Sequence, residues 1–83
     1  MKVRVLLFAR AKDLAGAASL ALELPDGATV ADLRRVLAVT YTRLGEFLPR
    51  CAAAVGGEVA SDETALAEGA EVAFLPPVSG GEP

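Results

Sequence analysis

Residues 29–44, TVADLRRVLAVTYTRL, decide the fold, because they hold the one long helical pattern in the chain. Thr29 and Asp32 have the spacing of a capping box, in which each side chain accepts a backbone N–H from the other residue. The helix should therefore begin at about Val30. Apolar residues then recur every three or four positions, as in a helix with one buried face. They are Val30, Leu33, Val36 and Leu37.

The same stretch indicates the exposed side of the helix and its end. Arg34 and Arg35 fall outside the apolar stripe. Residues 40–42 weaken the helix propensity, and Gly45 should end or interrupt the helix. Residues 46–50, EFLPR, are typical of a connecting turn.

Two strands should precede the helix. Residues 2–9, KVRVLLFA, alternate at first and then become fully apolar, which indicates a strand. Its faces carry Val3, Val5 and Leu7 on one side and Arg4, Leu6 and Phe8 on the other. Residues 19–25, SLALELP, alternate cleanly and predict a second, half-buried strand. A helical turn ended by Gly16 should lie between the strands, and residues 25–27 should form a turn.

Three further strands should follow the helix. Residues 51–55 are a short apolar run, and the Gly56-Gly57 pair after them predicts a tight hairpin into residues 58–60. Residues 61–70 are polar and turn-rich, with room for one helical turn. Residues 71–75 form the last strand, with Val72 and Phe74 on one face and Ala73 and Leu75 on the other. Pro76 and Pro77 stop it.

The fold class that follows is α+β. We expect a mixed sheet of about five strands, rolled around one main helix that covers one face. No second long helix is available for the other face. The domain should span residues 1–77, and residues 78–83 should form a flexible C-terminal tail.

Composition excludes several classes of function. The chain has no histidine and a single cysteine, so the usual general base, a disulfide framework and a cysteine-based zinc site are missing, and we expect no metal. The net charge is −3 and no basic cluster extends beyond Arg34-Arg35, which argues against nucleic acid. No apolar run approaches the ~20 residues that cross a bilayer, so we expect a cytoplasmic protein without a membrane partner. Such a chain suits binding or carrying better than catalysis alone.

The C-terminal residues, PPVSGGEP, favour a carrier. Pro76-Pro77 cannot join a β-ladder and prefers an extended conformation. From Pro77 to Gly81 the chain can reach roughly 13 Å from the domain. Gly80 and Gly81 have no side chains and could enter a narrow channel of a partner enzyme. A frayed terminus is the simpler alternative.

The chain resembles the family of molybdopterin synthase small subunits. The resemblance rests on the element order, on LLFAR at residues 6–10 and above all on EGAEVAFLPPVSGG at residues 68–81, and it covers residues 2–81. It implies the ubiquitin-like β-grasp fold. Related sulfur carriers, including the thiamine-pathway carrier, share this fold and the Gly-Gly ending.

The resemblance also implies a mechanism centred on Gly81. An E1-like adenylyltransferase would use ATP to adenylate the Gly81 carboxylate, and sulfur would replace the activated oxygen to give a thiocarboxylate. The tail would enter the large catalytic subunit of the synthase and pass sulfur to cyclic pyranopterin monophosphate. The chain would bind no cofactor itself and would be a non-catalytic subunit of a sulfurtransferase. The family suggests a heterotetramer.

A docking surface is expected on the sheet face opposite the helix. Alternation puts Phe8, Leu75 and Val59 there, and an exposed apolar patch usually marks a partner site. Residues 76–79, Pro76, Pro77, Val78 and Ser79, would contact the partner as the tail enters it. The alternative is that Phe8 belongs to the core, because a bulge can break the alternation.

The last two residues depart from the family, which normally ends at Gly-Gly. Here Glu82 and Pro83 follow, and neither should fit a channel shaped for glycine. Our hypothesis is that a protease removes Glu82 and Pro83 before activation. A carrier for thiamine or cysteine synthesis and a ubiquitin-like protein modifier remain as alternative functions.

Three other features have simpler interpretations. Cys51 could carry a persulfide, but a lone cysteine beside three alanines is more often a small core residue. Asp62, Glu63, Glu68 and Glu71 could suggest a metal or acid/base site, although solvation explains them better. Arg10 and Lys12 could pair with partner carboxylates, and ordinary surface charge explains them equally well.

Overall fold

The computed structural model describes residues 1–77 of the chain. Five strands make up its sheet: β1 Lys2–Leu7, β2 Ser19–Glu23, β3 Ala52–Val55, β4 Glu58–Ala60 and β5 Ala70–Leu75. The helices are α1 Ala9–Ala15, α2 Val30–Thr40, α3 Thr42–Phe47 and the 3₁₀ turn η1 Leu48–Arg50. No helix among the described residues is long and apolar enough to cross a membrane.

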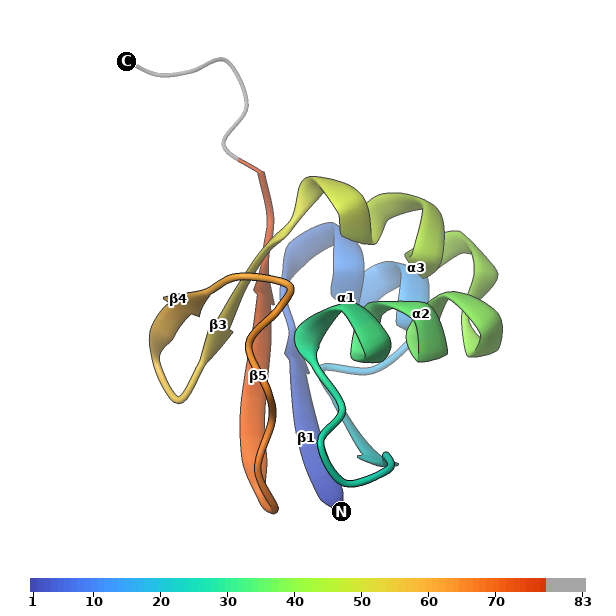
Figure 1. The fold of residues 1–83 in the computed structure, drawn as a ribbon. Helices are drawn as coiled ribbons and strands as arrows, with labels where there is room; N and C mark the ends of the chain where they lie inside the picture. The colour runs from blue at the N-terminus through green and yellow to red at the C-terminus, as the bar shows by residue number, and fades with distance from the viewer. Residues whose placement is uncertain (78–83) are drawn as a thin grey trace.

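The strands form one mixed sheet in the order β2-β1-β5-β3-β4 (Figure 1). The first and last strands, β1 and β5, lie parallel at its centre, and every other pair is antiparallel. Val5 pairs with Val72, and Leu7 pairs with Phe74, so their side chains lie on the same face. This arrangement confirms the predicted α+β roll and its mixed sheet.

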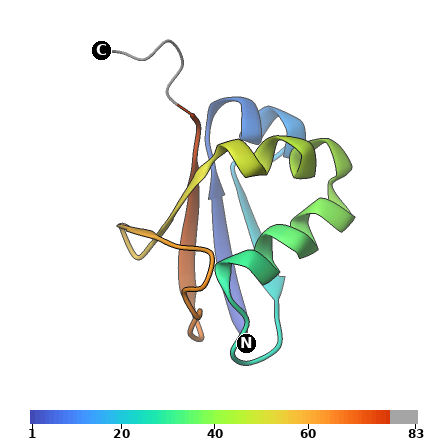
Figure 2. The same ribbon diagram turned by 45° about the horizontal axis from the view of Figure 1, so that its top comes forward.

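The helices all lie on one face of this sheet and leave the other face uncovered (Figure 2). The core lies between the two layers, and no polar or charged residue within residues 1–77 is buried. Its largest fully buried side chains are Phe74, Leu7, Leu33, Leu37, Leu44, Leu48, Val5, Val30 and Val72. The period of two in the strands and the period of 3.6 in α2 therefore point their apolar residues at each other.

Local sequence signals explain two of the connections. The capping box at α2 is complete: the Asp32 N–H donates to Thr29 Oγ1 at 3.3 Å, and the Thr29 N–H donates to Asp32 Oδ2 at 2.9 Å. The Gly56-Gly57 hairpin is also confirmed, with φ angles of 58° and 88°. Two positive φ angles define the turn that matches strand twist, which is why glycine is suited to both positions.

The predicted end of the long helix was wrong. The helix ends at Thr40, and Gly45 lies inside α3. A Cβ at Gly45 would come within 2.6 Å of the Cα and Cβ of Ala38, so glycine is required here for the close approach of α3 to α2. Val36 was also misplaced: it is 36% exposed, and the buried stripe consists of Val30, Leu33 and Leu37.

Residues 61–70 contain no helical turn, in contrast to the expectation that one could form there. The Thr64 carbonyl accepts the Val30 N–H at 3.1 Å, and the Asp62 carbonyl accepts the Ala31 N–H at 3.0 Å. The first N–H groups of a helix have no partner within the helix. This segment satisfies two of them for α2, and it contains turns at residues 62–63 and 68–69 in place of a helical turn.

Candidate functional site

The open face, meaning the sheet face without helices, carries a continuous apolar row. Paired residues lie side by side on the same face of a sheet. The row crosses four strands through directly paired residues: Leu6, Ala73, Ala54 and Val59. Leu75 lies two residues beyond Ala73 on β5 and extends the row toward the end of that strand.

Three of the predicted docking residues are exposed on this face. Phe8 is 44% exposed, Leu75 is 37% exposed and Val59 is 78% exposed. Leu7 pairs with Phe74, so the residues that follow them, Phe8 and Leu75, leave the two central strands side by side. The alternative that Phe8 belongs to the core is therefore wrong. Whether the open face contacts a partner stays a prediction at this point.

The backbone at Ala9 helps to keep Phe8 at the surface. Phe8 is extended, with φ −130° and ψ 153°, and Ala9 then has a φ of 51°. This left-handed conformation turns the chain from β1 into α1 in one step, at a cost of about 1 kcal/mol for a residue with a Cβ. The Phe8 carbonyl accepts the Ala11 N–H at 3.1 Å, so the first turn of α1 is fastened to the end of the strand.

The ladder stops where the C-terminal segment begins. Leu75 pairs with Ala52, and the next residues, Pro76 and Pro77, are exposed and have no N–H to donate. The other predicted tail residues, Val78, Ser79, Gly80 and Gly81, lie outside the described residues, as do Glu82 and Pro83. Pro76 therefore leaves the domain at the edge of the exposed apolar surface.

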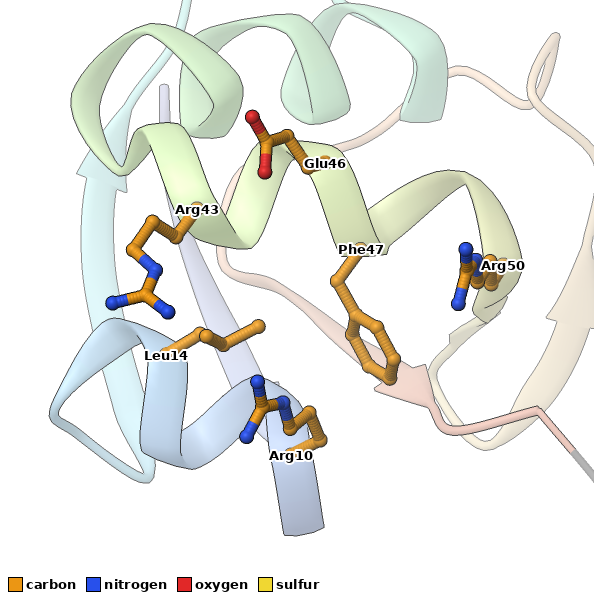
Figure 3. Close-up of a pocket in the computed structure, with 6 residues that line it drawn as sticks. All are labelled: Arg10, Leu14, Arg43, Glu46, Phe47 and Arg50. Atoms are coloured by element: carbon orange, nitrogen blue, oxygen red, sulfur yellow. The ribbon is translucent and has the colours of Figure 1, made fainter.

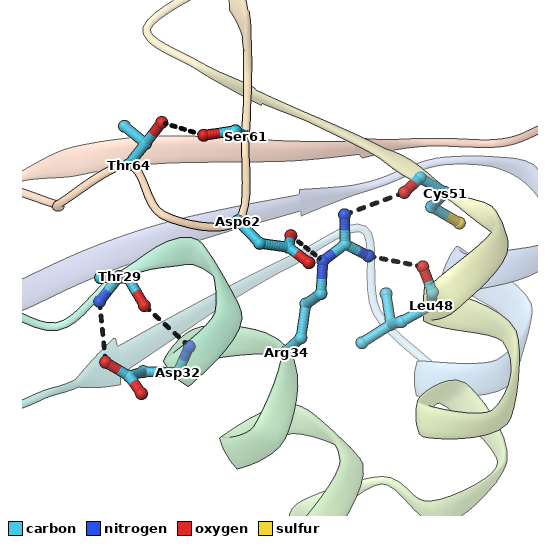
Figure 4. A network of polar contacts seen from close by, with 8 residues as sticks. All are labelled: Thr29, Asp32, Arg34, Leu48, Cys51, Ser61, Asp62 and Thr64. Carbon is cyan, nitrogen blue, oxygen red and sulfur yellow. Dashed lines mark hydrogen bonds and ion pairs between the residues drawn. The ribbon is translucent and has the colours of Figure 1, made fainter.

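Arg34 supports this end of the sheet, a role that sequence reasoning missed. Its Nε donates to Asp62 Oδ1 at 2.8 Å, and its other two nitrogens donate to the Leu48 and Cys51 carbonyls at 2.6 and 3.0 Å (Figure 4). The guanidinium lies 5.1 Å from the centre of the Phe74 ring. It thus joins α2 to the residue before β3 and to Phe74 of β5. Arg34 lies outside the buried stripe of α2, as predicted, but its side chain is only 19% exposed because of these contacts.

Cys51 is a core residue, as predicted. It is 4% exposed, and burial raises the pKa of its thiol, an effect that the nearby Arg34 charge only partly opposes. Its Sγ lies 3.8 Å from the Phe47 carbonyl oxygen. A buried thiol with a raised pKa is a poor nucleophile. The site offers no support for a persulfide on Cys51.

The four acidic residues that could have suggested a metal or acid/base site, Asp62, Glu63, Glu68 and Glu71, are exposed. Asp62 pairs with Arg34, and the Glu68 Oε1 accepts the Lys2 N–H at 3.0 Å. Glu63 and Glu71 are also at the surface. The part of the chain that the structure describes contains no group of three or more such ligands placed to hold a metal ion.

The comparison with known protein families decides the assignment. The model of the ThiS family matches residues 5–81, which include Gly80 and Gly81 and exclude Glu82 and Pro83. The chain belongs to the ThiS family.

Two relatives share most of the chain. The molybdopterin synthase sulfur carrier subunit of Chlamydomonas reinhardtii is 36% identical, over 98% of this chain and 100% of the relative. The protein of the same name from Arabidopsis thaliana is 33% identical, over 98% of this chain and 84% of the relative.

Solved structures give the same picture. A putative molybdopterin converting factor subunit 1 from Pyrococcus furiosus has a TM-score of 0.86 at 32% identity, over 94% of this chain and 99% of that one. SAMP1 from Haloferax volcanii, a small archaeal modifier protein, has a TM-score of 0.84 at 30% identity, over 98% and 100%. Subunit 1 in a complex with subunit 2 of the molybdopterin-converting factor from Helicobacter pylori has a TM-score of 0.72 at 28% identity, over 98% and 100%. The fold shared across the ThiS family and these neighbours is the ubiquitin-like β-grasp, as predicted.

Proposed function

We propose that this chain is the sulfur carrier subunit of a molybdopterin synthase. The observation that carries the proposal is the family match through Gly81, together with relatives of that name at 33–36% identity over nearly the whole chain. The structure supports it in two ways. It leaves an apolar sheet face uncovered, and it starts the C-terminal segment at the edge of that face.

The proposed chemistry takes place at the Gly81 carboxylate. A carboxylate is a poor electrophile, so an E1-like partner first transfers AMP from ATP to one of its oxygens and releases pyrophosphate. A sulfur nucleophile then forms a bond to the carbonyl carbon, and AMP leaves with that oxygen. The resulting thiocarboxylate donates its sulfur to cyclic pyranopterin monophosphate inside the large catalytic subunit. In this scheme ATP and the pterin are bound by the partners.

The open face is the surface that we propose for both partners. The solved Helicobacter pylori complex of subunits 1 and 2 is consistent with a larger partner subunit for this chain. We propose that the assembly is a heterotetramer. Because Phe8 and Leu75 flank the exit of the tail, a partner that covers them is placed to receive Gly80 and Gly81.

Glu82 and Pro83 must be removed in this scheme. The activated carboxylate belongs to Gly81, whereas the free carboxylate of the chain as written belongs to Pro83. We propose that a protease removes these two residues. The test is the intact mass of untagged protein purified from its native cells.

A mass that corresponds to a chain ending at Gly81, with one oxygen replaced by sulfur, would support trimming and the carrier role together. A mass of the full 83 residues would contradict trimming. In a reconstituted synthase, a trimmed chain with Gly81→Ala should transfer no sulfur while its melting temperature stays unchanged. An active Gly81→Ala synthase would refute the mechanism.

A protein modifier is the second candidate, because the structural likeness to SAMP1 is nearly as close as the likeness to the converting factor subunit. The first steps at Gly81 would be the same, but a target lysine would replace sulfur at the activated carbon. Covalent conjugates on other proteins, lost in a Gly81 variant, would favour the modifier. Thiocarboxylate with pterin product would favour the molybdopterin pathway over both the modifier and a carrier for thiamine or cysteine synthesis.

A further inference from the structure

A groove with an unusual charge runs between α1 and the α3–η1 segment, beside the end of β5 (Figure 3). Its volume is about 370 Å³, and it is open to solvent. Six residues line it: Arg10 and Leu14 of α1, Arg43, Glu46 and Phe47 of α3, and Arg50 of η1. We call it the arginine groove.

The groove gathers positive charge in an acidic chain. Three arginines face one glutamate there, whereas the whole chain has a net charge of −3. Within residues 1–77, none of Arg10, Arg43 and Arg50 forms an ion pair, although Arg34 and Arg35 each do. Like charges held close together repel one another, so such a cluster is favourable where an anion is to be bound.

Apolar surface lies between these charges. Leu14 and Phe47 are half-buried and pack against the core, and the close-up shows them between the arginine side chains. An arginine guanidinium binds a carboxylate through two parallel hydrogen bonds, and an apolar floor accepts an aliphatic side chain. We propose that the arginine groove binds an acidic, leucine-containing segment of a protein partner.

The position of the groove supports a protein partner. Arg10 follows Phe8 by two residues, and Arg50 precedes Ala52, the residue that pairs with Leu75, by two. The groove therefore adjoins the Phe8–Leu75 end of the open face, and a partner seated there reaches it without leaving the surface. The inference that a partner docked on the open face reaches the groove rests on the proposed function. The inference that the groove binds an acidic segment does not.

The chemistry is less suitable for phosphate or nucleic acid. Glu46 lines the groove, and its negative charge would repel a doubly charged phosphate more strongly than a single carboxylate. Three arginines in one groove are also too few to follow the backbone of a polyanion such as RNA. An apolar floor also contributes nothing to binding a bare phosphate.

The test is a titration of ¹⁵N-labelled full-length chain with a blocked octapeptide, Glu-Glu-Leu-Glu-Glu-Leu-Glu-Glu. Amide resonances of Leu14 and Phe47 should shift with saturation, and a peptide with lysine in place of glutamate should leave them unmoved. A triple variant with alanine at positions 10, 43 and 50 should weaken binding by about tenfold, because each exposed ion pair contributes little. The three arginine side chains that it lacks are exposed, so we expect an unchanged melting temperature.

Two single substitutions sharpen this test. Glu46→Gln removes the only negative charge of the groove and should tighten peptide binding by about twofold at low salt. Arg4→Ala is the matched control, because Arg4 is an exposed arginine on the open face, away from the helices, and its loss should leave the affinity unchanged.

Several outcomes would overturn the proposal. Peptide shifts confined to another surface, equal binding of the lysine peptide, or full displacement by inorganic phosphate at equal concentration would each do so. A chain ending at Gly81 provides a further check. If its Leu14 and Phe47 resonances differ from those of the full chain without any peptide, the groove binds the protein's own C-terminal residues instead, and the proposal of a partner segment is overturned. A sulfur-transfer assay stands apart from all of these results, so failure of the groove and failure of the carrier role are distinguishable.

Discussion

Two valines of equal exposure provide a sharp test of the open face. Val59 is 78% exposed on β4, and Val39 is 80% exposed on α2. Only Val59 lies on the proposed docking surface. We therefore compare Val59→Asp with Val39→Asp, which make the same chemical change at the same exposure on opposite sides of the sheet.

The expected magnitudes follow from burial. Full burial of a valine stabilises by roughly 1.5–2 kcal/mol. About a fifth of Val59 is already buried in the free protein, so its loss costs the fold about 0.3–0.4 kcal/mol, plus up to ~1 kcal/mol of strand propensity. The melting temperature should fall by no more than about 6–11 °C.

Docking should suffer more than folding. A partner that covers Val59 buries the remaining four fifths, about 1.2–1.6 kcal/mol, which corresponds to about tenfold in affinity. The aspartate carboxylate adds a desolvation cost, so tenfold is the lower bound. The assay is isothermal titration calorimetry with the purified large catalytic subunit. Val39→Asp should bind like the unmodified chain, and equal affinities for the two variants would refute the assignment of the open face.

Three further predictions address the same structure. Phe8→Asp should weaken docking by more than it lowers the melting temperature, because Phe8 is 44% exposed; a collapse of thermal stability with docking intact would contradict this. Gly45→Ala should destabilise the protein by about 1–2 kcal/mol in urea titrations, since overpacking against α2 outweighs the gain in helix propensity, and a stabilised variant would refute the close approach. The pKa of Asp32 is lowered chiefly by the Thr29 N–H and next by Arg35, so its contribution to stability is full above its ordinary value of 3.8 and is lost as the pH falls through the lowered value. The free energy of unfolding of the Asp32→Asn variant in urea should show no such loss. If the wild type stayed more stable than this variant at a pH below the lowered pKa of Asp32, the result would count against the capping box.

Much of the fold could be predicted because its causes are local in the sequence. The capping box at Thr29 and Asp32 starts α2, and Gly56-Gly57 sets the hairpin through its two positive φ angles. Alternation in β1 and β5 predicted the faces correctly, and so predicted the exposure of Phe8 and Leu75. Each of these signals acts within a few residues, where spacing alone determines the outcome.

The errors occurred where distant segments meet. In the sequence, Gly45 indicates the end of a helix. Its place inside α3 is explained only by the packing against α2, where an added Cβ would lie 2.6 Å from Ala38. The sequence gives no sign of the contacts of Arg34, because two of its acceptors are main-chain carbonyls, at Leu48 and Cys51. A carbonyl has no sequence signature, so this network could not be anticipated from residue types.

The arginine groove has the same origin. Arg10 lies on α1, whereas Arg43 and Arg50 come more than thirty residues later, and the chain as a whole is acidic. Surface charge explained Arg10 equally well at the level of sequence. Only the packing of α1 beside α3 brings the three guanidinium groups to one groove.

The topology also fixes the point from which the C-terminal segment leaves the domain. The segment follows β5, which is hydrogen-bonded on both sides, to β1 and to β3. Phe74, one residue before Leu75, is fully buried beneath the Arg34 guanidinium. The point where Pro76 leaves the domain is therefore fixed relative to Phe8, and the left-handed turn at Ala9 fixes Phe8 in turn. A partner that docks on the open face has by that act also placed Pro76 and Pro77, the base of the C-terminal segment. Such preorganisation lowers the cost of binding. It predicts that Ala9→Gly, which relaxes the turn without removing any contact of the open face, weakens docking while the melting temperature stays the same or rises; docking unaffected by this change would show that the rigidity of Phe8 is irrelevant to the partner.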